Sequence, residues 1–367
     1  MKKERRGIAT TTIVITLIVI IIVVIAGVGV YFVTKPSAAP AVMKAAMVYT
    51  VPINDWGWGT VHYNSWRHLK DVWGENIAIE YSELVPYVEC PRVLREYAAA
   101  GYKFVYLPEP WRPAIMEVAG DYPDTYFLYQ DSWLEGQPGP AEALPPNVMA
   151  FDDVKHETDY LAGMLSGYMT KTNHIGLVGG EAYPLVVRGA EAFKQGAKDV
   201  NPNVVFHEVW LGTWVDPVKG REVTLAMIDA GVDVVWEYAD LGGLGVHQAA
   251  MERGIYTTGG DVDKSILFPD TILACRVRPS TSLIEDTVRS IFEGTWENKG
   301  IKTGYTGTGD ATLVYNPNLE NIIPSNVKAA ISAKETAIGN KTFIVPDSIT
   351  GWKQEYDNWD AYLALYY

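Results

Sequence analysis

Short apolar runs alternate with amphipathic segments along most of the chain after residue 44. In the first half, the runs predicted to be buried strands are 45–49, 77–81, 104–107, 125–129 and 148–151. The helical patterns between these runs cover 61–73, 91–100 and 113–119. Strands that alternate with helices in this way form parallel sheets with helices on both faces. This half of the chain is therefore predicted to form one doubly wound, Rossmann-like α/β lobe.

The same alternation restarts after residue 170 and predicts a second lobe. Its predicted strands are 175–178, 204–208, 234–237 and 256–258, and its predicted helices are 183–199, 217–230 and 244–253. The run 272–277 is predicted to cross back toward the first lobe. We therefore assign 44–170 to the first lobe, 171–277 to the second, and 278–367 to a crossover and C-terminal segment that partly completes the first lobe. Because ligands bind beyond the carboxyl ends of strands in such sheets, two lobes predict a clamshell around a small molecule.

The first 36 residues differ in kind from the rest of the chain. Four basic residues (Lys2, Lys3, Arg5 and Arg6) precede a stretch without charge from Gly7 to Thr34. A helix that rises ~1.5 Å per residue needs about 20 residues to cross the bilayer core. The segment 1–36 is therefore predicted to be a transmembrane helix whose amino end stays inside, followed by a Pro/Ala linker at 37–43. This predicts a cell-membrane protein with an extracellular domain.

The same segment also resembles an archaeal class III, pilin-like signal peptide. The resemblance rests on KERRG followed by IATTTIVITLIV. It implies cleavage after Gly7 that leaves the apolar helix attached, and the sequence leaves open whether this cleavage occurs. Such a helix also allows self-assembly at the cell surface.

Composition narrows the classes of partner and chemistry. The 367 residues carry a net charge of -14, which argues against nucleic acid as a partner because phosphate binding needs a basic surface. Cys90 and Cys275 are predicted to be buried free thiols rather than a disulfide. No metal-binding or nucleophile motif is present, so neither a cofactor nor an enzymatic activity is expected. Asn340 begins an N-x-T sequon and is a candidate glycosylation site.

Aromatic and acidic residues follow several of the predicted strands. Those of the first lobe are Asn54, Asp55, Trp58, His62 and Trp111, and those of the second lobe and its crossing strand are Trp214, Asp240, Asp261 and Arg278. Indole faces pair well with flat rings, and carboxylates accept hydrogen bonds from ring and amine N–H groups. The set favours a flat, hydrogen-bond-donating ligand. The alternative for each Trp is that it caps a lobe, and for each Asp that it caps a helix.

Several blocks between residues 159 and 250 resemble the basic membrane protein family, the purine nucleoside receptor-like substrate-binding proteins of ABC transporters. The most specific block is DYLAGMLSGYMTKTNHIGLVGG (Asp159–Gly180), and further blocks are RGAEAFKQGAKDVNP, WVDPVKGRE, GVDVVWEYAD and GLGVHQAA. The resemblance spans about residues 44 to 300, nearly the whole predicted extracellular part. It implies the clamshell of a type I periplasmic binding protein.

The resemblance also implies roles for individual residues. Two aromatics that sandwich the purine in the family match Trp58 and Trp214, and the family's binding aspartates match Asp55 and Asp261. A family lysine that contacts ribose falls near Arg278, which departs from the pattern. His62 and Gly59 also stand where nucleoside receptors have an Asn. These departures weaken the expectation for ribose and leave the base sandwich intact.

The resulting prediction is an extracellular solute-binding protein of an ABC importer. It captures a purine base or purine nucleoside and delivers it to the permease, and its acidic site should reject phosphate. The alternative is a cell-surface filament or structural protein built through the pilin-like helix. In that case the aromatic tail at 352–367 would be a docking surface.

Overall fold

The computed structural model describes residues 42–131, 143–303, 306 and 311–346. The predicted membrane anchor with its signal motif, and the aromatic tail, lie outside these ranges. Within them, no helix is both long enough and apolar enough to cross a bilayer.

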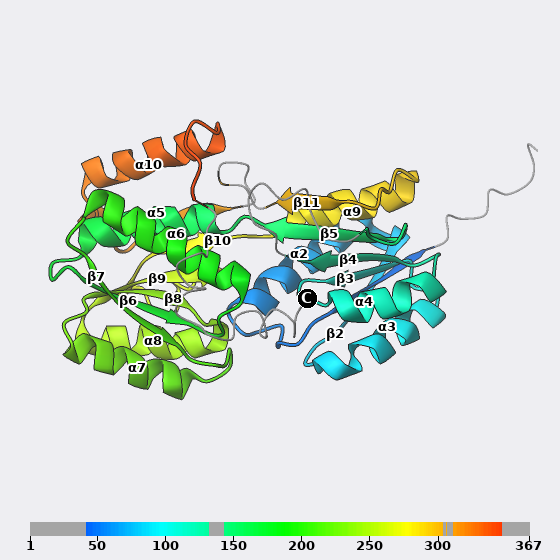
Figure 1. The fold of residues 1–367 in the computed structure, drawn as a ribbon, viewed down its shortest axis with the longest axis horizontal. Helices are drawn as coiled ribbons and strands as arrows, with labels where there is room; N and C mark the ends of the chain where they lie inside the picture. The colour runs from blue at the N-terminus through cyan, green and yellow to red at the C-terminus, as the bar shows by residue number, and fades with distance from the viewer. Residues whose placement is uncertain (1–41, 132–142, 304–305, 307–310, 347–367) are drawn as a thin grey trace, which may run out of the picture. The chain divides into compact units, whose positions relative to one another are not determined.

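The first lobe is built on a six-stranded parallel sheet with strand order β11-β5-β4-β3-β1-β2 (Figure 1). Its strands are β1 (Met43–Val48), β2 (Ile77–Ser82), β3 (Phe104–Leu107), β4 (Tyr126–Gln130), β5 (Val148–Asp153) and β11 (Gly300–Thr303). One face packs against α2 (Trp58–Trp73) and α9 (Thr281–Glu293). The other face packs against α3 (Cys90–Ala99) and α4 (Arg112–Val118). Each fully buried Leu, Ile or Phe in these two layers stabilises the lobe by about 1.5–3 kcal/mol.

The second lobe repeats this plan with strand order β12-β10-β9-β8-β6-β7. Its strands are β6 (His174–Gly179), β7 (Val205–Trp210), β8 (Val234–Tyr238), β9 (Tyr256–Asp261), β10 (Ile272–Val277) and β12 (Thr312–Tyr315), of which only β12 runs antiparallel to its neighbour. Its helices are α5 (His156–Met169), α6 (Pro184–Val200), α7 (Pro217–Asp229), α8 (Asp240–Arg253) and α10 (Ser325–Gly339). Helices α5, α6 and α10 share one core with the sheet, and α7 and α8 share the core on its other face.

Helix α5 belongs to the second lobe, although it precedes residue 170, where the sequence predicted the boundary. Tyr160 and Leu165 are buried in the same core as Phe193 and Trp236. In addition, the Trp236 indole N–H donates a 3.0 Å hydrogen bond to Asp159. The chain therefore first passes between the lobes just after β5, and it passes again between β10 and α9 and between β11 and β12.

The two cysteines are buried, and the asparagine of the sequon is exposed. Cys90 in α3 and Cys275 in β10 are buried free thiols in different lobes, which confirms the prediction of no disulfide between them. Asn340 is exposed just after α10, where its Oδ1 accepts hydrogen bonds from the Thr342 N–H (3.1 Å) and hydroxyl (2.7 Å). Glycosylation at Asn340 stays a prediction.

Candidate functional site

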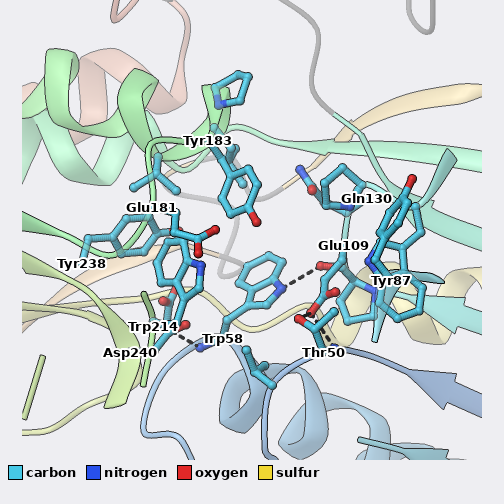
Figure 2. A pocket seen from close by; sticks show the side chains of 18 residues that line it. Thr50, Trp58, Tyr87, Glu109, Gln130, Glu181, Tyr183, Trp214, Tyr238 and Asp240 are labelled. Atoms are coloured by element: carbon cyan, nitrogen blue, oxygen red, sulfur yellow. Dashed lines mark hydrogen bonds between the residues drawn. The ribbon is translucent and has the colours of Figure 1, made fainter. Parts of the chain in front are cut away.

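A cavity of about 370 Å³ lies at the carboxyl ends of strands from both lobes (Figure 2). This volume falls within the range of small-molecule sites. Its aromatic lining residues are Trp58, Tyr87, Trp111, Tyr183, Trp214 and Tyr238, and its acidic ones are Glu109, Glu181, Asp240 and Asp261. No Lys, Arg or His occurs among the described residues that line it. The cavity therefore suits a flat ligand that donates hydrogen bonds and carries no negative charge.

Trp58 lies in the first turn of α2 and projects into this cavity. Its indole N–H donates a 2.7 Å hydrogen bond to the Pro108 carbonyl. The Lys155 ammonium nitrogen lies 3.1 Å from the centre of its ring. The His62 ring meets it edge-on, with 3.9 Å between ring centres. Because these three contacts fix the indole, it forms a rigid wall of the cavity rather than a flexible cap.

Trp214 reaches the cavity from the second lobe, on the loop between β7 and α7. It packs against the backbone of Gly180, where an added Cβ would lie 2.3 Å from the indole Cε3. The Tyr183 ring is parallel to it, with 5.9 Å between centres. Only glycine at residue 180 leaves room for the indole in this position.

Asp55 caps a helix instead of lining the cavity. Its carboxylate accepts hydrogen bonds from the backbone N–H groups of Gly57 (2.8 Å), Gly59 (2.8 Å) and Thr60 (3.0 Å). These are among the first N–H groups of α2, which have no partner inside the helix. Of the two readings that the sequence left open for Asp55, the structure has the capping one. Its neighbour Asn54 is exposed and does not line the cavity.

Asp240 begins α8 and contributes a buried carboxyl group to the cavity. Its Oδ1 accepts a 3.1 Å hydrogen bond from the Trp58 backbone N–H, so it links the two lobes. Burial and the nearby carboxylates of Asp55 and Asp261 raise the pKa of Asp240 well above its usual range. Its backbone has φ +48, in a region that non-glycine residues rarely adopt. Such strain concentrates at functional sites.

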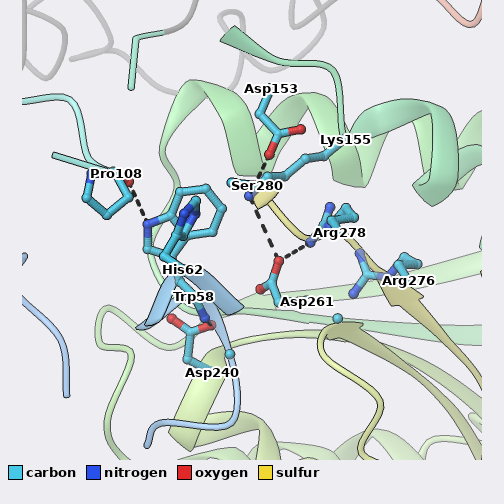
Figure 3. Close-up of polar contacts among 12 residues, drawn as sticks. Trp58, His62, Pro108, Asp153, Lys155, Asp240, Asp261, Arg276, Arg278 and Ser280 are labelled. Atoms are coloured by element: carbon cyan, nitrogen blue, oxygen red, sulfur yellow. Dashed lines mark hydrogen bonds and ion pairs between the residues drawn. The ribbon is translucent and has the colours of Figure 1, made fainter. Parts of the chain in front are cut away.

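Asp261 ends β9 and belongs to a buried charged cluster with Asp153, Lys155 and Arg278 (Figure 3). Of these four residues, only Asp261 lines the cavity. Arg278 Nη2 donates a 2.5 Å hydrogen bond to its Oδ1, and Lys155 Nζ lies 3.9 Å from the same atom. Burial opposes ionisation of Asp261, but these two cations, together with Lys264 and Arg276, outweigh it and lower the pKa of the carboxyl group. Arg278 itself does not line the cavity but contacts two residues that do, Asp261 and the ring of Tyr238, 5.0 Å away.

His62 packs edge-on against Trp58 and does not line the cavity (Figure 3). It is completely buried, and its Nδ1 is 2.7 Å from the Tyr106 hydroxyl. Burial, with Lys155 and Arg278 nearby, lowers the pKa of His62 well below its usual range. The neutral imidazole therefore supports the indole of Trp58 and offers no charge to a ligand.

Glu109 follows β3 and lines the cavity, but sequence reasoning did not give it a binding role. Its Oε1 accepts hydrogen bonds from the Thr50 N–H (3.0 Å) and hydroxyl (2.8 Å). Burial raises the pKa of Glu109 to about 7, although these hydrogen bonds oppose the shift. Glu109 therefore exists in both protonation states near neutral pH.

Four further lining residues were also missed, and all share one sequence signal. Tyr87, Gln130, Glu181 and Tyr183 each stand at or shortly after the end of a strand. Their place at strand ends is the signal by which the sequence could have identified them. In contrast, Trp58, Trp111, Trp214, Asp240 and Asp261 were predicted at strand ends and line the cavity. Within the described residues, no cluster of three His, Cys, Asp or Glu side chains could hold a metal ion.

Comparison with known proteins places the chain among transport proteins. A candidate ABC transporter glucose-binding protein of Haloferax volcanii, TsgA13, is 29% identical over 310 residues, which cover 83% of this chain and 74% of that one. A purine-binding protein of Brucella abortus is 26% identical over 282 residues, which cover 76% of this chain and 77% of that one.

Solved structures of solute-binding proteins share the fold. The ABC transporter solute-binding protein from Aeropyrum pernix has a TM-score of 0.72 at 16% identity and covers 87% of this chain and 98% of its own. The protein from Conexibacter woesei has a TM-score of 0.68 at 20% identity, with 83% and 99% covered. The family model of PnrA-like ABC transporter substrate-binding proteins matches residues 42–348, so the chain belongs to this family, whose members bind solutes for transport and are not enzymes.

Proposed function

We propose that this protein captures a free purine base between its lobes and delivers it to the permease of an ABC importer. The observation that carries the proposal is the pair of indoles, Trp58 from the first lobe and Trp214 from the second, at one cavity with acidic lining. Aromatic stacking contributes about 0.5–1.5 kcal/mol beyond the burial of each ring face. A ligand between the two indoles contacts both lobes and so stabilises their closed arrangement.

The carboxyl groups complement the polar edge of a purine. Ionised Asp261 accepts from a ring or amine N–H, and hydrogen bonds to charged groups contribute about 1.5–3 kcal/mol each. Asp240 and Glu109, whose pKa values are raised by burial, can instead donate a proton to a ring nitrogen when they are protonated. Since no cation lines the cavity among the described residues, a phosphorylated ligand would meet only carboxylates.

The surroundings of Trp58 favour a free base over a nucleoside. The groups suited to ribose hydroxyls, Lys155 and Arg278, lie outside the cavity lining. The Trp58 indole packs directly on Lys155, and Arg278 donates to Asp261 through Nη2. A ribose could therefore reach Lys155 only by displacing the Trp58 indole. The apolar helix and the aromatic tail on which surface assembly would depend lie outside the described residues.

Calorimetric titration of the full-length chain with adenine, hypoxanthine, adenosine and glucose tests the proposal. We expect micromolar or tighter binding of at least one free base and binding of its nucleoside weaker by about tenfold or more, equivalent to ~1.4 kcal/mol. The relative from Brucella abortus is named for purine binding and the one from Haloferax volcanii for glucose. Glucose binding without purine binding would overturn the proposal and leave the transport family unchanged.

A further inference from the structure

The amino end of α2 is capped by carboxyl groups from both lobes. Asp55, in the first lobe, accepts from the N–H groups of Gly57, Gly59 and Thr60. Asp240, in the second lobe, accepts a 3.1 Å hydrogen bond from the backbone N–H of Trp58, which lies between Gly57 and Gly59 in the chain. The cap of α2 is thus complete only while the second lobe is in contact with the first.

The approach between the lobes at this point is very close. A Cβ added to Gly57 would lie 2.0 Å from Asp240 Oδ1 and 2.8 Å from its Cα. Asp240 also holds a backbone φ of +48 to reach this position. A contact that needs both a glycine and a strained aspartate is specific to the arrangement of the lobes seen here.

The charges that face Asp240 come from several elements and are mainly negative. Asp55 precedes α2, and Asp261 ends β9. Lys264, which follows β9, is the only cation among the groups that act most strongly on Asp240. Tyr238, on β8, also interacts electrostatically with Asp240. The Lys264 ammonium donates a 2.7 Å hydrogen bond to Glu237 and is therefore already paired. An ionised Asp240 would be poorly compensated here.

We propose that Asp240 is a proton-carrying latch between the lobes. When the lobes close, its Oδ1 accepts the Trp58 N–H and its other carboxyl oxygen takes one proton from solvent. When they open, the carboxyl group returns to water and releases that proton. The same contact fixes the backbone of Trp58, so the latch also positions the indole for the ligand. The proposal rests on lobe closure in this family and is independent of which ligand binds.

The sign of the pH effect follows from where the proton is held. Burial and the neighbouring carboxylates raise the pKa of Asp240 in the closed form, whereas an exposed aspartate in the open form keeps its ordinary value of about 3.9. At a pH between the pKa of Asp240 in the open form and its pKa in the closed form, closure therefore takes up a proton. Over that window the ratio of closed to open molecules falls by up to about tenfold per pH unit as pH rises.

Distance measurement between spin labels on the two lobes tests the latch without any ligand. Val88 in the first lobe and Val218 in the second are exposed by 82% and 66%, and both native cysteines are buried with 0% exposure. Labels on V88C and V218C of the full-length chain would therefore report the lobe separation alone. We would record the distance distribution between about pH 4.5 and 8.5.

Two substitutions give opposite expected results. D240N keeps an oxygen that accepts the Trp58 N–H and stays uncharged, so its closed fraction should be high and should depend on pH less steeply than that of the wild type. D240A removes the acceptor and should be open throughout. If the wild type shows no pH dependence, or if D240N shows the same dependence as the wild type, the latch is refuted. The comparison of wild type with D240N decides the matter even if D240A fails to fold, and neither result depends on purine binding.

Discussion

The Lys155 ammonium nitrogen lies 3.1 Å from the centre of the Trp58 ring, on the segment that connects β5 to α5. It also lies 3.3 Å from Asp153 Oδ2 and is nearly inaccessible to solvent. One buried cation therefore supports the indole and compensates a buried carboxylate at the point where the chain first passes between lobes. Burial lowers the pKa of Lys155 to about 8, although Asp153 and Asp261 oppose the shift.

Substitution K155M should lower the stability of the fold and remove the support of the Trp58 indole. Methionine keeps an apolar stem but leaves Asp153 without its cation, and breaking a buried pair in this way costs about 3–5 kcal/mol. Urea unfolding followed by circular dichroism measures this loss. The matched control is R289M, because Arg289 makes an exposed cation–π contact with Trp73 at 5.6 Å. We expect R289M to lose less than about 1 kcal/mol, and equal losses in both variants would contradict the role given to Lys155.

Substitution W214A should lower the affinity for the purine by at least about tenfold, or ~1.4 kcal/mol, with little change in fold. The ring is half-buried on a loop, so its loss exposes the ligand more than the core. Trp210, which packs on neighbouring Gly179 and does not line the cavity, provides the control W210A. Calorimetry should give W210A near-native affinity. Unchanged affinity in W214A would remove the indole sandwich.

Substitution G180A should displace the Trp214 indole without touching the ligand directly. Its Cβ would lie 2.3 Å from Trp214 Cε3, closer than carbon atoms approach in folded proteins. The indole must therefore move, and we expect a loss of affinity in the same direction as for W214A. G179A, whose Cβ would instead meet Trp210 at 2.4 Å, should leave the affinity nearly unchanged. Equal affinities in G180A and wild type would show that the position of Trp214 does not matter.

Substitution E109Q should stabilise the protein at alkaline pH but not at acid pH. The pKa of Glu109 is raised to about 7 by burial, so ionisation in the folded protein is unfavourable. The wild type should lose stability as pH rises from the unfolded pKa, about 4.3, through 7, on the order of 3 kcal/mol from this group. E109Q should lack this loss, so its free energy of unfolding should exceed that of the wild type at about pH 8 and match it at about pH 4.5. The opposite order in urea unfolding would contradict the raised pKa.

The two-lobed fold was predictable because most of its inner strands are buried on both faces. Such strands appear in the sequence as short apolar runs, and the run at 104–107, for example, coincides with β3. The lobe of α5 was not predictable, since the helix is buried around nearly its whole circumference and its sequence does not say which sheet covers it. Strands β11 and β12 were not predicted; β11, with the sequence GIKT, has one large apolar residue and so forms no apolar run.

The site was predictable in part for a related reason. Strand ends identified Trp58, Trp214, Asp240 and Asp261 as cavity candidates, because topology alone brings such ends together. Sequence could not separate the helix cap Asp55 from the cavity residue Asp240, since both are aspartates at a helix start. That distinction depends on which lobe supplies the acceptor, a relationship fixed only in three dimensions.

A crystal structure of the protein with adenine tests the central claim most directly. We predict adenine density in the cavity between Trp58 and Trp214, with its ring parallel to both indoles and its polar edge on the carboxyl groups of Asp240 and Asp261. Adenine bound elsewhere, or a cavity that takes only a sugar with neither indole stacked on a flat ring, would contradict it.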